Sequence, residues 1–257
     1  MLTFRNTNIV FIVLLLFIIA LNIVAGVSVY VYALLLFVYS LIVFWGCYFI
    51  NSNFFLPVIC SSGTQQKQIA ISFDDGPVDH FTPEILELLA QQNVEAAFFC
   101  IGNRVDQNGS LLKKIYSQNH LVANHSYSHH FWFDLFSAKK MLADLRRMDL
   151  AMEKVIGVKP KLFRPPYGVT NPNLKKAIVQ GGYTPVGWSV RSMDTVNNNE
   201  KKLLDKIINA LKPGAVYLFH DTSKTTVAVL PAFLRHARER GYDIVRLDKM
   251  LNLTPYA

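Results

Sequence analysis

The sequence predicts an α/β fold, in which a mainly parallel sheet of about seven strands follows two apolar transmembrane helices. Residues 9–50 contain neither a charged residue nor a proline. After Lys67, short apolar runs alternate with helical patterns, which is the order that builds parallel sheets. Polar clusters follow five of these runs, at the strand ends where α/β folds carry their chemistry.

The first 60 residues are expected to form a membrane anchor. As a helix at about 1.5 Å per residue, the uncharged run reaches about 63 Å, which is about two bilayer hydrocarbon cores of ~30 Å each. We therefore expect two spans, near 8–25 and 30–50, joined by a turn around Gly26. Residues 54–60 are too short to cross a bilayer and are interpreted as an interfacial lead into the rest of the chain.

Two alternatives to this anchor are open. Arg5 precedes an apolar stretch that ends at Ala25, as in a cleaved signal peptide, although the second apolar segment would then remain as an anchor. The run could also form a buried core hairpin, but so long an uncharged segment is unusual in a soluble domain of this size.

Charge and cysteine content narrow the class of protein. The net charge of +8 includes Arg5, which leaves +7 on the remainder. Such a basic domain suits anionic headgroups or an anionic polymer, and no Lys/Arg cluster indicates nucleic-acid binding. The cysteines are Cys47, Cys60 and Cys100. Their spacing fits no metal site, and an odd, scattered set argues against a disulfide framework.

Residues 61–257 are expected to form the second domain, as an incomplete or distorted barrel or as an open sheet. The expected strands cover 68–73, 95–101, 120–124, 161–164, 183–188, 215–219 and 243–247. The expected helices between them cover 82–92, 109–118, 137–155, 171–180, 199–211 and 226–240. Asn-Pro and Pro-Gly pairs at element boundaries support these divisions.

The strongest chemical signal is a set of two carboxylates and two imidazoles. Asp74 and Asp75 follow the first expected strand, and His125 and His129 follow the third. Asp-Gly-Pro is also good turn chemistry. One carboxylate with two imidazoles leaves metal positions open for water and substrate, while the second carboxylate is free to act as a base on a metal-activated water. The two histidines share a face if their backbone is helical.

Other polar residues follow later strands. Arg164, ahead of a rigid Pro-Pro, suits a guanidinium that holds a carboxylate. Tyr167 in the same turn offers a backbone N–H to an oxyanion. His220 ends an apolar strand and is expected to donate a proton, with Asp194 as the carboxylate that orients it and raises its pKa. An ordinary surface charge is the alternative for Arg164, and a core histidine the alternative for His220.

These motifs resemble the NodB-type polysaccharide deacetylases, carbohydrate esterase family 4, over residues 67–248. The family's motifs match in order at Ser72–Pro77, His125–His129, Arg164–Gly168 and Leu218–His220. The resemblance implies a distorted (β/α) barrel with fewer than eight strands, and it implies a metal-dependent deacetylase.

The resemblance also implies roles, residue by residue. Asp74 would be the catalytic base, and Arg164 would hold it. Asp75, His125 and His129 would be the metal ligands, with Zn²⁺ as the expected metal and Co²⁺ or Ni²⁺ as alternatives.

The remaining roles come from the same comparison. His220 would be the acid and Asp194 its partner, the Tyr167 N–H would stabilise the oxyanion, and Leu218 would contact the acetyl methyl. Trp188, which opens the fourth motif, is expected on the substrate side of the pocket.

The fourth motif departs from the family pattern. The family often has Asp-x-x-Asp-Trp here, whereas this chain has Arg191 in place of the first Asp and Thr195 in place of the Trp. Catalysis is expected to survive this change, because Asp194 is retained. A wider pocket, or one that prefers an anionic substrate, is the expected effect.

We therefore expect a membrane-anchored, zinc-dependent hydrolase that removes N-acetyl groups, ahead of O-acetyl groups, from a glycan. Peptidoglycan is the first expected substrate, ahead of an exopolysaccharide or a lipid-linked glycan. The expected partners are the acetylated glycan and, through the N-terminal helices, membrane lipid, but not nucleic acid. The alternatives are an amidohydrolase acting on a small non-sugar amide and a non-catalytic, membrane-tethered glycan-binding module.

The membrane side follows from the two spans, which place both chain ends on one side. Arg5 favours a cytoplasmic N-terminus, whereas a wall substrate requires the outer side. We expect a multi-pass protein of the cell membrane with an extracytoplasmic catalytic domain. A cytoplasmic domain would make a lipid-linked glycan precursor the better substrate.

Overall fold

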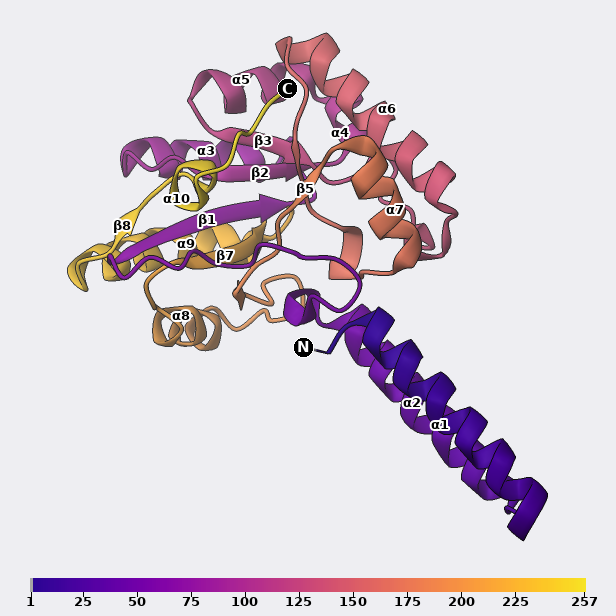
Figure 1. Ribbon diagram of the computed structural model, residues 1–257. Helices are drawn as coiled ribbons and strands as arrows, with labels where there is room; N and C mark the ends of the chain where they lie inside the picture. The colour runs from indigo at the N-terminus through magenta and orange to yellow at the C-terminus, as the bar shows by residue number, and fades with distance from the viewer. Residues whose placement is uncertain (1) are drawn as a thin grey trace.

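The computed structural model describes residues 2–257, and its centre is a parallel sheet that forms an incomplete barrel (Figure 1). The strand order is β5-β4-β3-β2-β1-β7-β6, with β8 paired to the start of β1. The strands are β1 (Gln68–Asp74), β2 (Ala97–Cys100), β3 (Leu121–Asn124), β4 (Leu162–Phe163), β5 (Thr184–Pro185), β6 (Val190–Arg191), β7 (Ala215–His220) and β8 (Asp243–Ile244). The expected α/β fold with about seven parallel strands is confirmed.

Helices follow most of the strands. They are α1 (Phe4–Ala25), α2 (Val29–Tyr48), α3 (Thr82–Gln91), α4 (Gly102–Gln107), α5 (Gly109–Ser117), α6 (Ala138–Ile156), α7 (Pro172–Gly181), α8 (Glu200–Asn209), α9 (Lys224–Glu239) and α10 (Leu247–Leu251), with 3₁₀ turns at Ile50–Ser52, Phe133–Leu135 and Pro166–Gly168. The short elements α4, α10 and β6 were not expected from the sequence, because fewer than two helical turns or two strand residues leave no periodic pattern.

Helix α7 shows how local sequence sets these boundaries. Asn171 is its N-cap, and the Asn171 Oδ1 accepts a hydrogen bond from the Leu174 N–H at 2.8 Å. Pro172 occupies the first helical position, where its missing N–H costs nothing. Gly182 ends the helix in the left-handed conformation, with φ of 72°.

The alternation of side chains along β1 places the chemistry inside the barrel. Ile71 and Phe73 belong to the large cluster between the sheet and its helices. Ala70 belongs to a second cluster, formed by residues of several strands in the barrel interior. Because side chains alternate with a period of two, Ser72 and Asp74 point to the same side as Ala70. Asp74 therefore lies at the open end of the barrel, directly above a packed interior.

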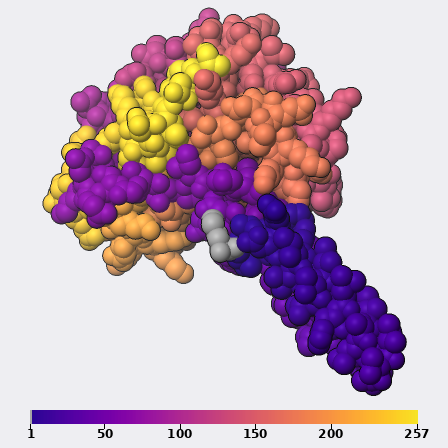
Figure 2. All heavy atoms as spheres, viewed as in Figure 1, coloured from indigo at the N-terminus to yellow at the C-terminus, as the bar shows by residue number. Residues whose placement is uncertain are grey.

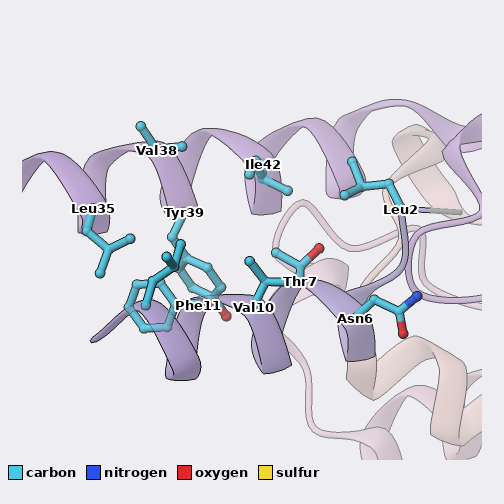
Figure 3. Close-up of a pocket in the computed structure, with 10 residues that line it drawn as sticks. Leu2, Asn6, Thr7, Val10, Phe11, Leu35, Val38, Tyr39 and Ile42 are labelled. Carbon is cyan, nitrogen blue, oxygen red and sulfur yellow. The ribbon is translucent and has the colours of Figure 1, made fainter. Parts of the chain in front are cut away.

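Helices α1 and α2 form an antiparallel pair that projects from the rest of the protein as a rod (Figures 1 and 2). The two helices contact each other through Phe11 and Tyr39, whose ring centroids lie 4.4 Å apart. Both rings line a pocket between the helices (Figure 3). The Tyr39 hydroxyl donates to Asn8 Oδ1 at 2.8 Å. The two helices cover Phe4–Ala25 and Val29–Tyr48, where the two spans were expected near 8–25 and 30–50.

Both helices of the pair are long and apolar enough to cross a membrane, with mean hydropathies of 2.9 and 2.1. In the most apolar 18-residue stretch of each helix, only 0% and 6% of the residues are buried. The alternative of a buried core hairpin therefore does not fit. Large apolar side chains such as Phe17, Val24 and Leu34 are exposed. A membrane anchor and a signal sequence both remain compatible with these helices.

The base of the helix pair is bonded directly to the rest of the protein. The Phe4 N–H donates to the Phe54 carbonyl at 2.9 Å. Thr170 donates from its N–H to the Cys47 carbonyl and from its hydroxyl to the Gly46 carbonyl, both at 3.1 Å. Phe54 packs so closely on Gly46 that a Cβ there would lie 2.1 Å from the ring. The contact requires glycine.

The segment expected to lead along the membrane interface is buried in protein. Phe54, Phe55, Leu56 and Val58 are 2–6% exposed, and they join a cluster with residues of α6 and α7. Their apolar surface therefore stabilises the junction between the helix pair and the barrel.

Candidate active site

The carboxyl ends of the strands form the floor of a pocket. β1 ends at Asp74 and β7 at His220, and the parallel register pairs these two residues. His125 directly follows β3, and Arg164 directly follows β4. The pocket encloses about 250 Å³ and is lined by Asp74, Asp75, His125, His129, Pro165, Tyr167, Gly168, Trp188, Arg191, Thr195, Leu218 and His220. The remaining two candidates, Arg164 and Asp194, are buried behind this lining.

Arg164 fixes the position of Asp74. Its Nη1 donates to Asp74 Oδ1 at 2.6 Å and to Ser72 Oγ at 2.8 Å. Its Nε and Nη2 donate to the carbonyls of Val186 and Gly187 at 3.1 and 2.8 Å. Burial lowers the pKa of Arg164, against the attraction of Asp74. Because the guanidinium occupies Oδ1, the second oxygen of Asp74 is the one left to act.

Asp75, His125 and His129 form the only cluster of metal-ligand type found among residues 2–257, and their donor atoms lie within 4.8 Å of one another. Asp75 Oδ1 is 3.5 Å from His125 Nε2 and 3.4 Å from His129 Nε2. His125 Nδ1 lies 2.9 Å from the carbonyl oxygen of Arg164. A carbonyl can only accept, so Nδ1 carries the proton and Nε2 presents a lone pair to the cluster.

The loop after β3 carries both histidines, and it is not helical. Ser126 and His129 have positive φ values of 66° and 42°. Asn124 Oδ1 accepts from the Ser126 N–H at 2.8 Å, and the Ser126 hydroxyl accepts from the His129 N–H at 3.0 Å. Asp144 on α6 accepts from the Tyr127 N–H at 2.7 Å. The two histidines thus converge because side-chain hydrogen bonds shape the turn. The helical backbone considered from the sequence is not the backbone of this loop.

Electrostatics favour the unprotonated form of this cluster. Burial and the charge of His125 lower the pKa of His129 to about 4, against the opposing charge of Asp75. Burial alone would raise the pKa of Asp75, but the neighbouring histidines, His125 foremost, outweigh it and lower the pKa. A neutral imidazole and an ionised carboxylate are the forms that bind a metal.

These residues fit a divalent transition metal. The donor set is one carboxylate oxygen and two imidazole nitrogens, which suits zinc and its neighbours. The lone pair on His125 is directed by a second hydrogen bond, as in protein metal sites generally. Three ligands also leave positions for water and substrate.

His220 and Asp194 form a buried pair beside the cluster. The His220 Nδ1 lies 2.8 Å from Asp194 Oδ1, and the His220 N–H donates to Asp194 Oδ2 at 2.7 Å. Asp194 also accepts from the hydroxyls of Ser192 and Thr226. Burial would lower the pKa of His220, but the hydrogen bond and charge of Asp194 raise it. Nδ1 is therefore the protonated nitrogen toward Asp194, and Nε2 is available to the pocket.

Tyr167, Leu218 and Trp188 complete the wall. Tyr167 adopts the left-handed conformation, with φ of 60°, and its ring is 4.7 Å from that of His129. The N–H groups of the next two residues turn back to Pro165 and Pro166, whereas the Tyr167 N–H has no hydrogen-bond partner within residues 2–257. It is therefore available to an oxyanion.

Sequence reasoning missed several supporting groups. Ser72 accepts a hydrogen bond from Arg164, and although it opens the first family motif it was given no role of its own. Asp221 is fully buried, with Oδ2 accepting from the Thr82 hydroxyl at 2.7 Å. Burial raises the pKa of Asp221 to about 7, although the hydrogen bond of Thr82 opposes it. Its position beside His220 was a signal that could have been read.

The chain is also similar to known proteins in sequence and fold. A family model described as polysaccharide deacetylase matches residues 61–186. A peptidoglycan-N-acetylglucosamine deacetylase of Bacillus cereus is 34% identical over 191 residues, which cover 72% of this chain and 89% of the relative. The chain belongs to the polysaccharide deacetylase family.

Other members of this family differ in length and named substrate. The peptidoglycan-N-acetylmuramic acid deacetylase PdaA of Bacillus subtilis is 30% identical over 192 residues, or 73% of each chain. The peptidoglycan-N-acetylglucosamine deacetylase PgdA of Listeria monocytogenes is 33% identical over 184 residues, or 72% of this chain, which spans only 39% of that relative. The crystal structure of the peptidoglycan N-acetylglucosamine deacetylase Bc1960 superimposes with a TM-score of 0.72 at 28% identity, covering 77% of this chain and 94% of the other.

Within this polysaccharide deacetylase, the two departures from the family pattern line the pocket. Arg191 is exposed at its rim, with the guanidinium carbon 5.7 Å from the Trp188 ring. Thr195 occupies the position where the family often has a tryptophan, and it is exposed in the same wall. The described residues supply no ion pair to Arg191.

Proposed function

We propose that this polysaccharide deacetylase hydrolyses N-acetyl groups of peptidoglycan or a related acetylated glycan. One observation carries the proposal: Asp74, fixed by Arg164, lies in the same pocket as the cluster of Asp75, His125 and His129. The named substrates of the relatives, acetylated sugars of peptidoglycan, support the choice of glycan.

Asp74 acts as the base in this proposal. Its Oδ1 is held by Arg164, so Oδ2 accepts a proton as water attacks the carbonyl carbon of the acetamido group. Arg164 prevents the carboxylate from turning away. The new carbon–oxygen bond forms a tetrahedral oxyanion, which the N–H of Tyr167 stabilises.

His220 completes the reaction as the acid. Asp194 holds its Nδ1, and Nε2 donates a proton to the sugar nitrogen as the carbon–nitrogen bond breaks. Acetic acid and a free amino sugar are released. Asp74 then gives its proton to solvent and His220 takes one up, which restores both groups. Leu218, 2% exposed in the pocket wall, contacts the acetyl methyl.

Asp75, His125 and His129 would hold a divalent metal, with Zn²⁺ proposed ahead of Co²⁺ or Ni²⁺. When bound, such an ion supplies a Lewis acid that polarises the carbonyl and lowers the pKa of water. His125 and His129 are held by the β3 loop independently of this ion, because their backbone is fixed by Asn124 and Ser126.

Arg191 favours an anionic glycan. An exposed guanidinium at the pocket rim, with no carboxylate beside it in the described structure, pairs readily with a carboxylate of the substrate. N-acetylmuramic acid carries a free lactyl carboxylate where no stem peptide is attached to it, whereas N-acetylglucosamine carries none. We therefore propose peptide-free muramic acid residues of peptidoglycan ahead of the glucosamine residues.

The apolar helices α1 and α2 are proposed to anchor the enzyme in the cell membrane, with residues 61–257 as the extracytoplasmic catalytic domain. Their length, exposure and mean hydropathy support the anchor. The substrate supports the outer side, because peptidoglycan lies outside the membrane.

Acetate release tests the function. The 257-residue chain, purified in detergent and loaded with zinc, is offered peptidoglycan and chitooligosaccharide beside its Asp74→Asn variant. Release that disappears in the variant supports the deacetylase and ranks the two glycans. Absence of release by the zinc-loaded protein from peptidoglycan, chitooligosaccharide and a lipid-linked glycan would refute it and favour a small amide substrate.

A further inference from the structure

A groove runs between the start of α1 and the outer face of α7, at the base of the helix pair. It encloses about 850 Å³. Its lining combines three cations with apolar and amide side chains, and comprises Thr3, Phe4, Arg5, Asn53, Phe54, Phe55, Leu56, Pro57, Pro172, Lys175, Lys176, Val179 and Gln180. Figure 1 shows α7 next to this end of the pair. The groove is separate from the catalytic pocket, with which it shares no residue.

The three cations are not neutralised by the protein. Arg5, Lys175 and Lys176 are all exposed, and none has an ion pair within residues 2–257. The two chain segments that build the groove supply no carboxylate, because residues 1–73 and 154–193 contain neither Asp nor Glu. The groove therefore presents an uncompensated positive charge, which favours an anionic ligand.

The position of the groove along the helix pair indicates that the anionic ligand is a lipid headgroup. Arg5 lies in the first turn of α1, and the opposite end at Ala25 is about 30 Å away along the helix axis. This length matches a bilayer hydrocarbon core. With the pair inserted as proposed, Arg5 lies at the level of the lipid headgroups. Lys175 and Lys176 reach the same level with their long side chains.

The rest of the lining suits an amphipathic molecule. Val179 is 75% exposed on the outer face of α7, and Pro57 is exposed at the other side of the groove. The walls are already held in place, since Phe4 is hydrogen-bonded to Phe54 and α7 is capped by Asn171. A ligand can thus place its phosphate among the cations and its glycerol and first acyl carbons against the apolar wall.

We propose that this groove binds the phosphate headgroup of an anionic membrane lipid, such as phosphatidylglycerol. The proposal rests on the membrane insertion of α1 and α2, and it does not depend on the deacetylase reaction. A bound lipid at this point would fasten α7 to the bilayer surface and so fix the tilt of the catalytic domain.

Lipid titration of the 257-residue chain in detergent tests the groove. Native mass spectrometry measures the affinity for phosphatidylglycerol and for phosphatidylcholine, in the native protein and in the double variant Lys175→Gln/Lys176→Gln. The double variant Lys201→Gln/Lys202→Gln is the matched control, because these lysines form an exposed pair on α8, outside the groove lining.

We expect the protein to bind phosphatidylglycerol more tightly than phosphatidylcholine. The affinity for phosphatidylglycerol should fall about thirtyfold in Lys175→Gln/Lys176→Gln and change little in the control variant. Equal binding of the two lipids, equal loss in both variants, or full competition by soluble glycerol phosphate would overturn the assignment. Acetate release from soluble chitooligosaccharide, measured on the same samples, is expected to be unchanged. Loss of lipid binding with intact release thus separates this proposal from the proposed function.

Discussion

The Nη1 of Arg164 lies 2.6 Å from the Oδ1 of Asp74, and both side chains are almost completely buried. A buried ion pair is costly to form, and breaking it by removing one partner leaves an uncompensated charge. The pair therefore serves the position of the carboxylate more than the stability of the fold. This relationship makes Arg164 and Asp74 separable by experiment.

Asp74→Asn is expected to lower the rate of acetate release by a factor of about 10² to 10⁴, since the amide cannot take a proton from water. Zinc content should stay near that of the native protein, because Asp74 is not in the proposed ligand set. Metal analysis and kinetics on the same sample check both points. Asp79→Asn, at an exposed site in the same loop, is the control, and activity equal to that control would exclude Asp74 as the base.

Arg164→Met is expected to destabilise the protein as well as inactivate it. The substitution leaves Asp74 buried without its counter-charge, at a cost of about 3–5 kcal/mol. Thermal unfolding followed by intrinsic fluorescence measures the loss. The double variant Arg164→Met/Asp74→Asn should recover part of the stability but none of the activity. A stable Arg164→Met protein would show that the pair does not hold the charge of Asp74.

Asp194→Asn is expected to shift the pH dependence of turnover. Asp194 raises the pKa of His220, so the proton needed by the leaving nitrogen is retained to a higher pH than an ordinary imidazole allows. Without that charge the pKa falls, and the alkaline limb of the kcat profile moves to lower pH. A pH–rate series of the two proteins measures the limb. An unmoved limb would assign the acid to another group.

Zinc binding is expected to persist into mildly acidic solution. The pKa of His129 is lowered to about 4 by burial and by His125, and a ligand must be deprotonated to bind. Protonation of His129 should therefore not weaken the affinity until the pH falls toward that value. Isothermal titration of the chelator-treated protein checks this. His129→Ala should lose the metal at every pH, whereas His130→Ala, at an exposed neighbour, should retain it.

Arg191→Gln is expected to reduce the preference for a charged sugar. A charge-assisted hydrogen bond to the free lactyl carboxylate would be lost, which lowers kcat/KM on peptide-free N-acetylmuramic acid residues by about tenfold or more. The value on N-acetylglucosamine residues should change little, and Lys113→Gln, on the exposed face of α5, is the control. Mass spectrometry of digested peptidoglycan distinguishes the two products. Equal effects on both sugars would remove Arg191 from substrate selection.

Much of the site could be predicted because its residues sit at strand ends that follow clear apolar runs. Asp74 ends β1 and His220 ends β7, and the parallel register then places them side by side. The assignment of Arg164 to Asp74 came from the family resemblance, and the structure has that contact.

Other parts could not be predicted, for physical reasons. The β3 loop owes its shape to Asn124, Ser126 and Asp144, and no local periodicity reveals such side-chain bonds. The groove joins Arg5 to Lys175 and Lys176, which are far apart in the sequence and meet only through the tertiary fold. The burial of Phe54 likewise depends on the close approach allowed by Gly46.

The bonded junction between the helix pair and the barrel determines how far the enzyme can reach. Thr170 donates hydrogen bonds to Gly46 and Cys47 at the end of α2, and Phe4 donates one to Phe54. The helix pair is therefore joined to the barrel without a flexible linker. An enzyme on a long linker would sweep a deep volume of wall. In this enzyme, once α1 and α2 are inserted, the catalytic pocket stays at a constant distance from the lipid surface. Under the proposed function, its substrate would be glycan within that fixed distance of the membrane.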